Sequence, residues 1–324
     1  MRDRVRRSRR GAGRVGATLA AVGLLGLSCA PTALAEAAFT ADESAGPVTG
    51  LATDTAKQVY WTAAKSSGTV TALGPDGKAK GQVTYGATPT DVEAVSFRDG
   101  RLWIGDIGDV EGSRSSVTVY RIGAFDYGTK APYRSYTLSY ADKAQDSGAM
   151  TVSPKGRLYV VTRSAKPGIY RAPATMTAGG PVNKLTRVGD APANVTDVAF
   201  TADGTKLVLR TLTSVHVYYP FSFEQTASAA LPDTVQGLAI TPSLTGEGLL
   251  VSGTGSPVPV ERITLPTTVA SIAPAPATPA PSPSPSASAA ARSTGASPKH
   301  STLWALLAAA AISLVAALVV VVKR

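Results

Sequence analysis

The feature that most constrains this chain is a strand–turn–strand pattern that recurs five times in its middle. The five segments begin at residues 48, 90, 145, 195 and 235. They read VTGLATDTAKQVYWTAAK, TDVEAVSFRDGRLWIGDIG, QDSGAMTVSPKGRLYVVTRS, VTDVAFTADGTKLVLRTLT and VQGLAITPSLTGEGLLVSGT. Short strands that repeat at intervals of roughly 40 to 55 residues are typical of β-propeller blades.

A third strand follows each opening, in the order TVTAL, VTVYRI, GIYRA, VHVYY and VERITL. A β-sandwich would not repeat the same opening five times, and the region has no helical periodicity. The sequence therefore predicts an all-β domain, a β-propeller of five blades, with a sixth left open. The segment AFTADESAG, residues 38–46, either completes a sixth blade or supplies the missing strand of the last blade and closes the ring.

The N-terminus is typical of a secretion signal. Seven arginines surround the start of the chain, Ala17 to Leu27 forms an apolar core, and Ala33-Leu34-Ala35 gives a small-x-small cleavage pattern. This pattern predicts a signal peptide over residues 1–35. Two alternatives stay open, which are lipoprotein processing at Cys29 and export by the twin-arginine route.

The C-terminus predicts a membrane anchor. Leu303 to Val322 is 20 residues long without a charge, which is enough to span a bilayer as part of a helix over 302–322. The basic tail, residues 323–324, places that end in the cytoplasm. A disordered linker rich in Pro, Ala and Ser covers residues 267–301 and separates the helix from a propeller domain at 36–266. We expect a single-pass protein of the cell membrane with its N-terminal domain extracellular.

The formal net charge of +10 does not indicate nucleic-acid binding. The basic excess lies in the predicted signal, the linker and the tail, whereas residues 36–266 hold 21 basic and 21 acidic residues. A domain with no net charge has no long-range attraction for a polyanion. We therefore expect a monomeric propeller with a membrane as one partner and no nucleic acid.

Carboxylates gather around the second repeat. Asp91 and Glu93 begin its first strand, and Asp106 and Asp109 follow its second strand. In a propeller, first strands begin and second strands end at the same face, which we call the top face. We expect the side chains near this face to form a ligand surface, and the candidates are Asp91, Glu93, Asp106, Asp109, Asp146, Asp197, Arg114, Arg163 and Arg210.

Three interpretations of the acidic residues stay open. Asp91, Glu93, Asp106 and Asp109 could bind Ca²⁺, which takes oxygen ligands, so calcium is the one cofactor that the sequence suggests. Carboxylates could also act as a catalytic acid and base. The third interpretation is structural, because an Asp at a strand end often accepts hydrogen bonds from backbone N–H groups. The sequence favours the structural interpretation, and it assigns no catalytic residue.

Three short motifs carry a resemblance to a known group. Asp-Val-Glu-Ala at 91–94, Gly-Asp-Ile-Gly-Asp at 105–109 and Val-Tyr-Arg at 119–121 are similar to motifs of uncharacterised, secreted or membrane-anchored bacterial β-propeller proteins of actinobacterial type. The resemblance covers about residues 48 to 265 and implies a propeller fold.

The chain departs from the group's pattern at three positions. Val110 stands where relatives usually have Asn, Gly148 where they have Glu, and Leu238 where they have Glu. The missing polar groups favour a module that binds a protein or small-molecule ligand at the cell surface. The alternative is a propeller hydrolase, similar to phytases or lactonases, with a calcium site on the top face. Because His216 is the only histidine of the predicted domain, histidine-based catalysis has little support.

Overall fold

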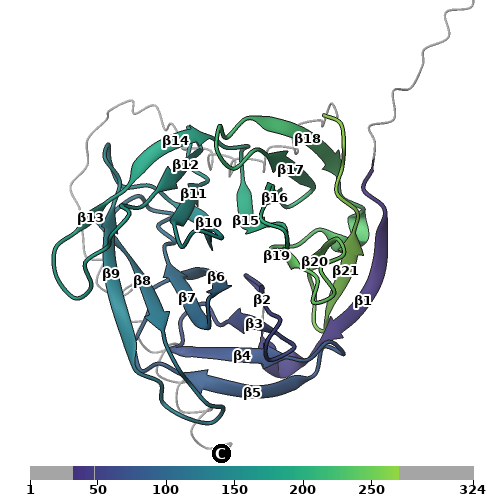
Figure 1. Ribbon diagram of the computed structural model, residues 1–324, viewed down its shortest axis with the longest axis horizontal. Coiled ribbons are helices and arrows are strands. Elements are labelled where there is room, and N and C mark those ends of the chain that lie inside the picture. The colour runs from purple at the N-terminus through teal and green to yellow at the C-terminus, as the bar shows by residue number, and fades with distance from the viewer. Residues whose placement is uncertain (1–31, 47, 270–324) are drawn as a thin grey trace, which may run out of the picture. The chain divides into compact units, whose positions relative to one another are not determined.

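The computed structural model of the chain describes residues 32–46 and 48–269. Within these residues five antiparallel sheets surround a central axis (Figure 1). The predicted all-β propeller of five blades is confirmed. Most of the predicted signal peptide and linker, and the whole terminal helix, lie outside the described residues. No helix within the described ranges is long and apolar enough to cross a membrane.

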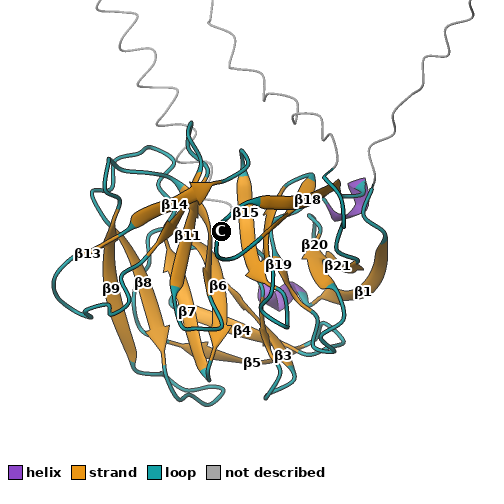
Figure 2. Cartoon of the chain, turned by 45° about the horizontal axis from the view of Figure 1, so that its top comes forward, coloured by secondary structure: helices purple, strands orange, loops and turns teal. Residues whose placement is uncertain are grey.

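The blades follow chain order, and the first strand of each lies nearest the axis (Figures 1 and 2). Blade 1 contains β2 (Ala52–Asp54), β3 (Val59–Ala63), β4 (Thr69–Leu73) and β5 (Ala79–Thr84). Blade 2 contains β6 (Val92–Arg98), β7 (Arg101–Asp106), β8 (Val117–Ile122) and β9 (Tyr133–Ser139). Blade 3 contains β10 (Ser147–Val152), β11 (Leu158–Thr162), β12 (Gly168–Arg171) and β14 (Thr186–Asp190).

The last two blades complete the ring. Blade 4 contains β15 (Val195–Phe200), β16 (Leu207–Thr211), β17 (Ser214–Tyr218) and β18 (Gln225–Ala230). Blade 5 contains β19 (Ile240–Pro242), β20 (Leu249–Ser252), β21 (Val258–Ile263) and, as its outermost strand, β1 (Ala35–Ala41). Two short 3₁₀ helices, Glu43–Ala45 and Asp233–Val235, lie in connections between blades.

The N-terminal strand closes the ring. β1 pairs antiparallel with β21, from Ala35 opposite Ile263 to Ala41 opposite Val258. Residues 38–41, which belong to β1, therefore supply part of the missing strand of the last blade, and no sixth blade forms among the described residues. Pairing β1 with β21 covers a sheet edge that would otherwise expose unpaired N–H and C=O groups.

Outer strands also contact the following blade through short parallel bridges. Thr84 of β5 bridges to Lys130 in blade 2. β13 (Asn183–Lys184) lies in the connection from β12 to β14 of blade 3 and pairs parallel with the end of β9, as a fifth strand of the blade 2 sheet. Thr32 bridges to Ala230 of β18. Backbone hydrogen bonds thus join three blades to their neighbours at the periphery as well as through the core.

The hydrophobic core lies between neighbouring blades. Trp61 is fully buried between blades 1 and 2, and Trp103 is 7% exposed between blades 2 and 3. Nearer the axis the first strands approach so closely that side chains do not fit everywhere. A Cβ atom on Gly148 would lie 2.3 Å from the carbonyl oxygen of Val195 in blade 4.

Trp103 gives a test of this packing. It lies on β7, the second strand of blade 2, and its ring stacks on Tyr136 with centroids 5.8 Å apart. Trp103→Ala should lower the free energy of unfolding by about 3–5 kcal/mol, because the indole leaves a cavity between two blades. Urea denaturation followed by circular dichroism measures the change.

Leu212→Ala is the control, since Leu212 is 43% exposed. This substitution should alter the free energy of unfolding by no more than about 0.5 kcal/mol. Equal midpoints for the Trp103→Ala variant and the unsubstituted protein would contradict the packing described above.

Candidate functional site

The predicted carboxylates meet at the top face of blade 2. Asp91 and Glu93 lie at the start of β6, and Asp106 lies at the end of β7, where it is opposite Val92 in the strand register. Asp109 lies three residues further on, in the connection to β8. The structure shows that each of these carboxylates has protein partners.

Asp106 is buried and fixes the turn that enters the blade. Its carboxylate accepts hydrogen bonds from the backbone N–H groups of Asp91, at 2.8 Å, and Thr90, at 3.1 Å. Arg114 donates to the same carboxylate at 2.9 Å and to the carbonyl of Gly108 at 2.8 Å. These donors compensate the negative charge of the buried Asp106 carboxylate.

Asp109 and Asp146 connect blade 2 with blade 3. Asp109 accepts from the N–H groups of Ser113, at 2.9 Å, and Arg114, at 3.0 Å, and so holds the loop before β8. The N–H of Asp109 itself donates to the carboxylate of Asp146 across the blade boundary, at 2.8 Å. Here an aspartate at the start of a first strand ties two blades together.

Glu93 lies at the centre of an ion-pair network that spans three blades. Arg163 of blade 3 donates to both of its carboxylate oxygens, at 3.0 and 3.2 Å, and to Asp146 at 2.6 Å. Lys65 of blade 1 reaches both Glu93 and Asp91, with nitrogen–oxygen distances of 3.1 Å. Burial alone would lower the pKa of Lys65, but hydrogen bonds and charges from Glu93 and Asp91 outweigh burial and raise it.

Sequence reasoning missed Lys65. The residue follows β3, so the same rule that placed Asp106 near the top face could have placed the lysine there. Its partners, however, belong to the next blade, 26 and 28 residues further along the chain. Only the spatial order of the blades shows which acidic groups Lys65 contacts.

Among residues 32–46 and 48–269, no three His, Cys, Asp or Glu side chains are arranged to hold a metal ion. At the four carboxylates proposed as calcium ligands, a cation would compete with Lys65, Arg114 and Arg163. The contacts of these four carboxylates therefore fit the structural interpretation better than a calcium centre.

Five of the nine predicted ligand-surface residues are buried, and two of these, Asp197 and Arg210, lie between blades 4 and 5. Arg210, on β16, is fully buried, and Asp197, on β15, is 1% exposed. Asp197 accepts from the N–H groups of Val198 and Ile240, each at 2.8 Å, and the second bond crosses from blade 4 to blade 5. Burial raises the pKa of Asp197 and lowers that of Arg210 to about 9.

The guanidinium of Arg210 donates hydrogen bonds to backbone carbonyl groups inside the fold. It donates to the carbonyl of Ser252 at 2.7 Å and to the carbonyls of Val235 and Ala239. The expectation that Arg210 and Asp197 belong to a ligand surface is wrong, because both side chains join blade 4 to blade 5 beneath that surface.

An open groove lies beside the ion-pair network, between the top edges of blades 2 and 3. Its volume is about 1100 Å³. Apolar residues such as Val110, Pro167 and Tyr170 share the lining with charged residues of both signs. The charged residues are Asp109, Glu111, Asp142, Lys143, Asp146, Arg163, Lys166, Arg187 and Asp190. Three of the predicted ligand-surface residues, Asp109, Asp146 and Arg163, therefore line a cavity.

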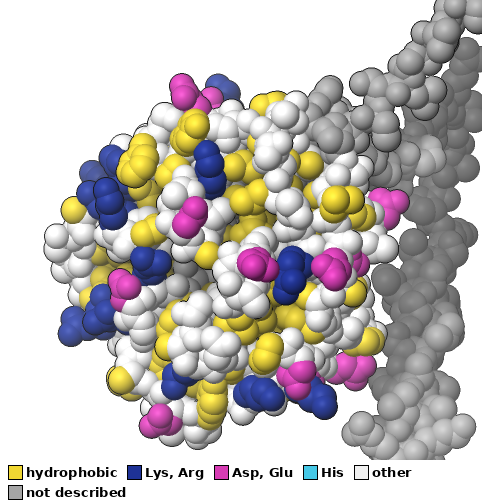
Figure 3. Space-filling view, turned by 45° about the vertical axis from the view of Figure 1, so that its right-hand side comes forward, with side chains coloured by type: hydrophobic (Ala, Val, Ile, Leu, Met, Phe, Trp, Pro, Cys, Tyr) yellow, Lys and Arg dark blue, Asp and Glu magenta, His cyan; other side chains and the backbone are white. Residues whose placement is uncertain are grey.

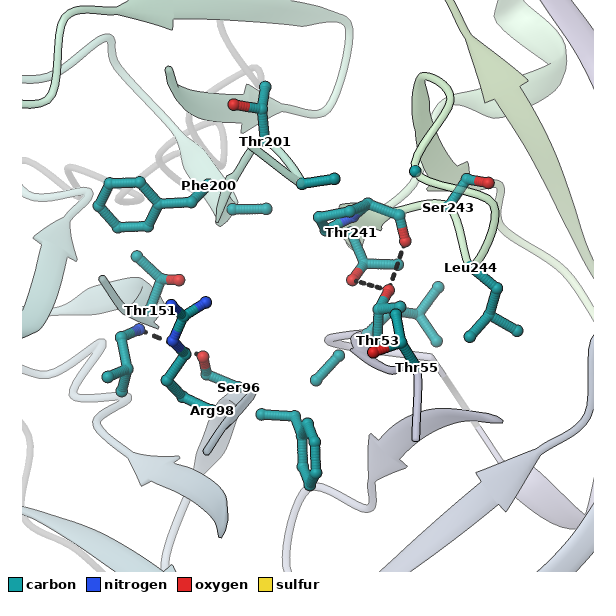
Figure 4. A pocket seen from close by; sticks show the side chains of 18 of the residues that line it. Thr53, Thr55, Ser96, Arg98, Thr151, Phe200, Thr201, Thr241, Ser243 and Leu244 are labelled. Carbon is teal, nitrogen blue, oxygen red and sulfur yellow. Dashed lines mark hydrogen bonds between the residues drawn. The ribbon is translucent and has the colours of Figure 1, made fainter. Parts of the chain in front are cut away.

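A second cavity, of about 650 Å³, opens at the opposite end of the central channel (Figure 4). Hydroxyl groups dominate the polar lining, and Thr53 and Thr241 are hydrogen-bonded to each other at 2.8 Å. Thr53 also donates to the carbonyl of Pro242. Arg98 and Asp99 are the only charged residues of this lining within the described chain.

His216 lies in none of the described cavities. It is on β17, and its ring nitrogens contact Ser214, at 2.9 Å, and Gln225, at 3.2 Å. Burial lowers its pKa. The position agrees with a packed strand residue.

Comparisons with known proteins assign no family and no activity to this chain. No family model matches the chain, and no curated protein matches it. A hydrazine synthase from Kuenenia stuttgartiensis superposes with a TM-score of 0.38 and 14% identity, over 63% of this chain and 55% of that chain. A gluconolactonase from Xanthomonas campestris superposes with a TM-score of 0.41 and 16% identity, over 64% of this chain and 70% of that chain. Likenesses this distant say nothing about activity.

The partners of Asp106 predict how its replacement acts. In Asp106→Asn an NH₂ group takes the place of one acceptor oxygen and faces a backbone N–H or Arg114. We expect a loss of about 1–3 kcal/mol in the free energy of unfolding, since a charged hydrogen-bond acceptor is removed from a buried site. Adding a calcium chelator should leave the melting temperature unchanged in both proteins.

Glu111→Gln is the control, because Glu111 is exposed on the same loop. It should change the free energy of unfolding by less than about 0.5 kcal/mol. A chelator that lowers the melting temperature of the unsubstituted protein, and not that of Asp106→Asn, would favour the calcium interpretation instead.

Proposed function

We propose that this protein is a membrane-anchored, extracytoplasmic β-propeller that binds a protein partner through the groove between blades 2 and 3. The propeller provides the binding surface. The predicted signal peptide, linker and terminal helix support the location, with the domain extracellular and a single span in the membrane. Fold alone does not set function, so the argument for binding depends on the groove.

The observation that carries the proposal is a set of unpaired charges at the groove. Glu111, Lys143 and Lys166 line it, and within the described chain their side chains make no hydrogen bond or ion pair. Val110 lies beside them and is 73% exposed, which is unusual for a large apolar side chain. Charges of both signs next to an exposed apolar group suit a polar protein segment better than a uniformly charged ligand.

The floor of the groove supports binding without rearrangement. Asp146 and Arg163 form an ion pair at 2.6 Å, and Arg163 is held on its other side by Glu93. Asp109 is fixed by backbone donors from its own loop. A surface that is already ordered loses less conformational entropy when a partner binds, which favours affinity.

The same contacts weigh against a hydrolase. A catalytic carboxylate or a calcium ligand needs oxygen lone pairs that face the substrate or the ion. At the top face of blade 2 the carboxylates instead accept from backbone N–H groups and from Lys65, Arg114 and Arg163. We therefore do not extend the phytase-like or lactonase-like alternative to this chain.

Site-specific photocrosslinking in intact cells tests the proposed groove. A benzoylphenylalanine placed at Val110 should form an adduct with a second protein, whereas the same group at Leu212, an exposed position on blade 4, should not. Lys166→Glu should suppress the adduct, because it reverses one of the unpaired charges.

Lys206→Glu, on the opposite side of the propeller, serves as the matched charge reversal and should leave the adduct intact. Absence of an adduct at Val110, or equal adducts at Val110 and Leu212, would contradict binding at this groove.

Protease treatment tests the location separately. Protease added to intact cells whose wall is permeable to it should release the whole propeller by cutting in the Pro/Ala/Ser-rich linker, since an extended linker is accessible and the closed ring is not. Immunoblotting for the released domain measures this. Complete protection would place the domain on the other side of the membrane.

A further inference from the structure

Four arginines gather on the side of blade 2 that faces blade 3, away from the top face. The strand register sets Arg98 of β6 opposite Arg101 of β7, and Arg121 of β8 opposite Arg134 of β9. Residues directly opposite in an antiparallel sheet share one face and lie close together. Two like-charged pairs in one sheet destabilise it unless something compensates them.

Arg121 is held in place by aromatic rings. Its guanidinium carbon lies 5.4 Å from the centroid of Trp103 and 5.5 Å from that of Tyr136. Both rings are buried and belong to the core between blades 2 and 3. Cation–π contacts of this kind position the charge but leave the N–H groups of the guanidinium free to donate.

Protein acceptors are scarce around these arginines. Within the described chain the side chains of Arg121 and Arg134 have no hydrogen bond and no ion pair. Arg98 donates to the carbonyl of Pro154 at 3.1 Å, and its buried Nε lies 3.6 Å from Asp99, which is the only contact of that group. Arg101 donates to the backbone carbonyl of Asp99 at 3.2 Å.

A cavity of about 340 Å³ lies against this cluster. Arg98, Arg101 and Arg121 line it, Trp103 and Tyr136 also contribute to its wall, and residues 174–176 of blade 3 close the far side. Asp99 is the only acidic residue of the lining. The volume lies at the lower end of the range for ligand pockets, so it suits a small anionic group.

Two other parts of the surface carry both signs of charge. In the view of Figure 3, which shows the side where β1 and β21 lie, basic and acidic side chains alternate. In the ion-pair network of the top face, Lys65, Arg114 and Arg163 each pair with carboxylates. At the arginine cluster of blade 2, three arginines and one acidic side chain line a cavity, and Arg134 lies opposite Arg121 in the strand register.

We propose that the arginine cluster of blade 2 binds the phosphate group of a ligand in this cavity through Arg98, Arg101 and Arg121, with Arg134 opposite Arg121 in the strand register. A guanidinium presents its donors in a planar fork that matches the oxygens of a phosphate. The bound anion also offsets the repulsion within the two opposed arginine pairs. The site is independent of the groove between blades 2 and 3 at the top face.

The phosphate group could belong to two kinds of ligand. A free metabolite carries a phosphate monoester, whereas a lipid headgroup or a polymer carries a phosphodiester. Glycerol 3-phosphate and glycerophosphoglycerol are soluble probes of the two forms, and inorganic phosphate probes the group alone.

Isothermal titration calorimetry of the full-length protein in nonionic detergent, at constant ionic strength, measures binding of the three probes. We expect saturable binding of inorganic phosphate and of at least one ester. Arg121→Gln should weaken it about tenfold or more, since one charge-assisted hydrogen-bond donor is removed. Tighter binding of the monoester assigns the site to a metabolite, and tighter binding of the diester assigns it to a lipid or polymer.

Arg134→Gln provides a second readout, independent of the aromatic contacts. It removes one opposed arginine pair, so it should raise the melting temperature without phosphate and reduce the rise that phosphate produces. Arg171→Gln is the control, because Arg171 lies on β12 outside the cavity, and it should leave both values unchanged.

The proposal fails if none of the three probes binds saturably, or if Arg171→Gln weakens binding as much as Arg121→Gln. The second result would show a general effect of net charge. A melting temperature that falls in Arg134→Gln without phosphate would show that the arginine pairs are not in repulsion.

Discussion

The pairing of β1 with β21 is the interaction on which the rest of the structure depends. It pairs Glu36 with Arg262 and Ala41 with Val258, and it turns a row of sheets into a ring. Most of the core lies between blades, so each blade needs both neighbours in order to bury its two faces. The ion-pair network around Glu93 and the groove beside it span separate blades, and their geometry exists only while the ring is closed.

Charged side chains serve as connectors between blades. Glu93 joins Lys65 of blade 1 to Arg163 of blade 3, and Asp197 receives an N–H from blade 5. Such buried or half-buried ions are stable because each carboxylate has several donors. Acidic residues whose spacing in the sequence resembles a metal site therefore form hydrogen bonds and ion pairs that hold the propeller together.

The sequence predicted the blades and the face where Asp91, Glu93, Asp106 and Asp109 lie, since these follow from a repeat and its strand order. It left open whether residues 38–46 complete a sixth blade or close the last one. It did not predict the partners. Arg163 follows β11 and reaches the top-face network, whereas Arg210 lies within β16 and points into the core. That difference depends on where a strand ends, which is the least certain part of any prediction from sequence. The opposed arginines of blade 2 were missed for a related reason, because strand register is not visible in the repeat.

The closing strand also sets an order of events. The first described strand of the chain pairs with the last, and Glu36 lies 226 residues before its partner Arg262. A ribosome makes β1 first, yet that strand finds no partner until the final blade has been synthesised. The native ring therefore cannot form on a partly made or partly exported chain, and both edges of the domain must be in the same compartment before it folds. Contacts so distant in sequence make folding slow, so the unfinished ring is the state in which this protein is most exposed to aggregation and proteolysis.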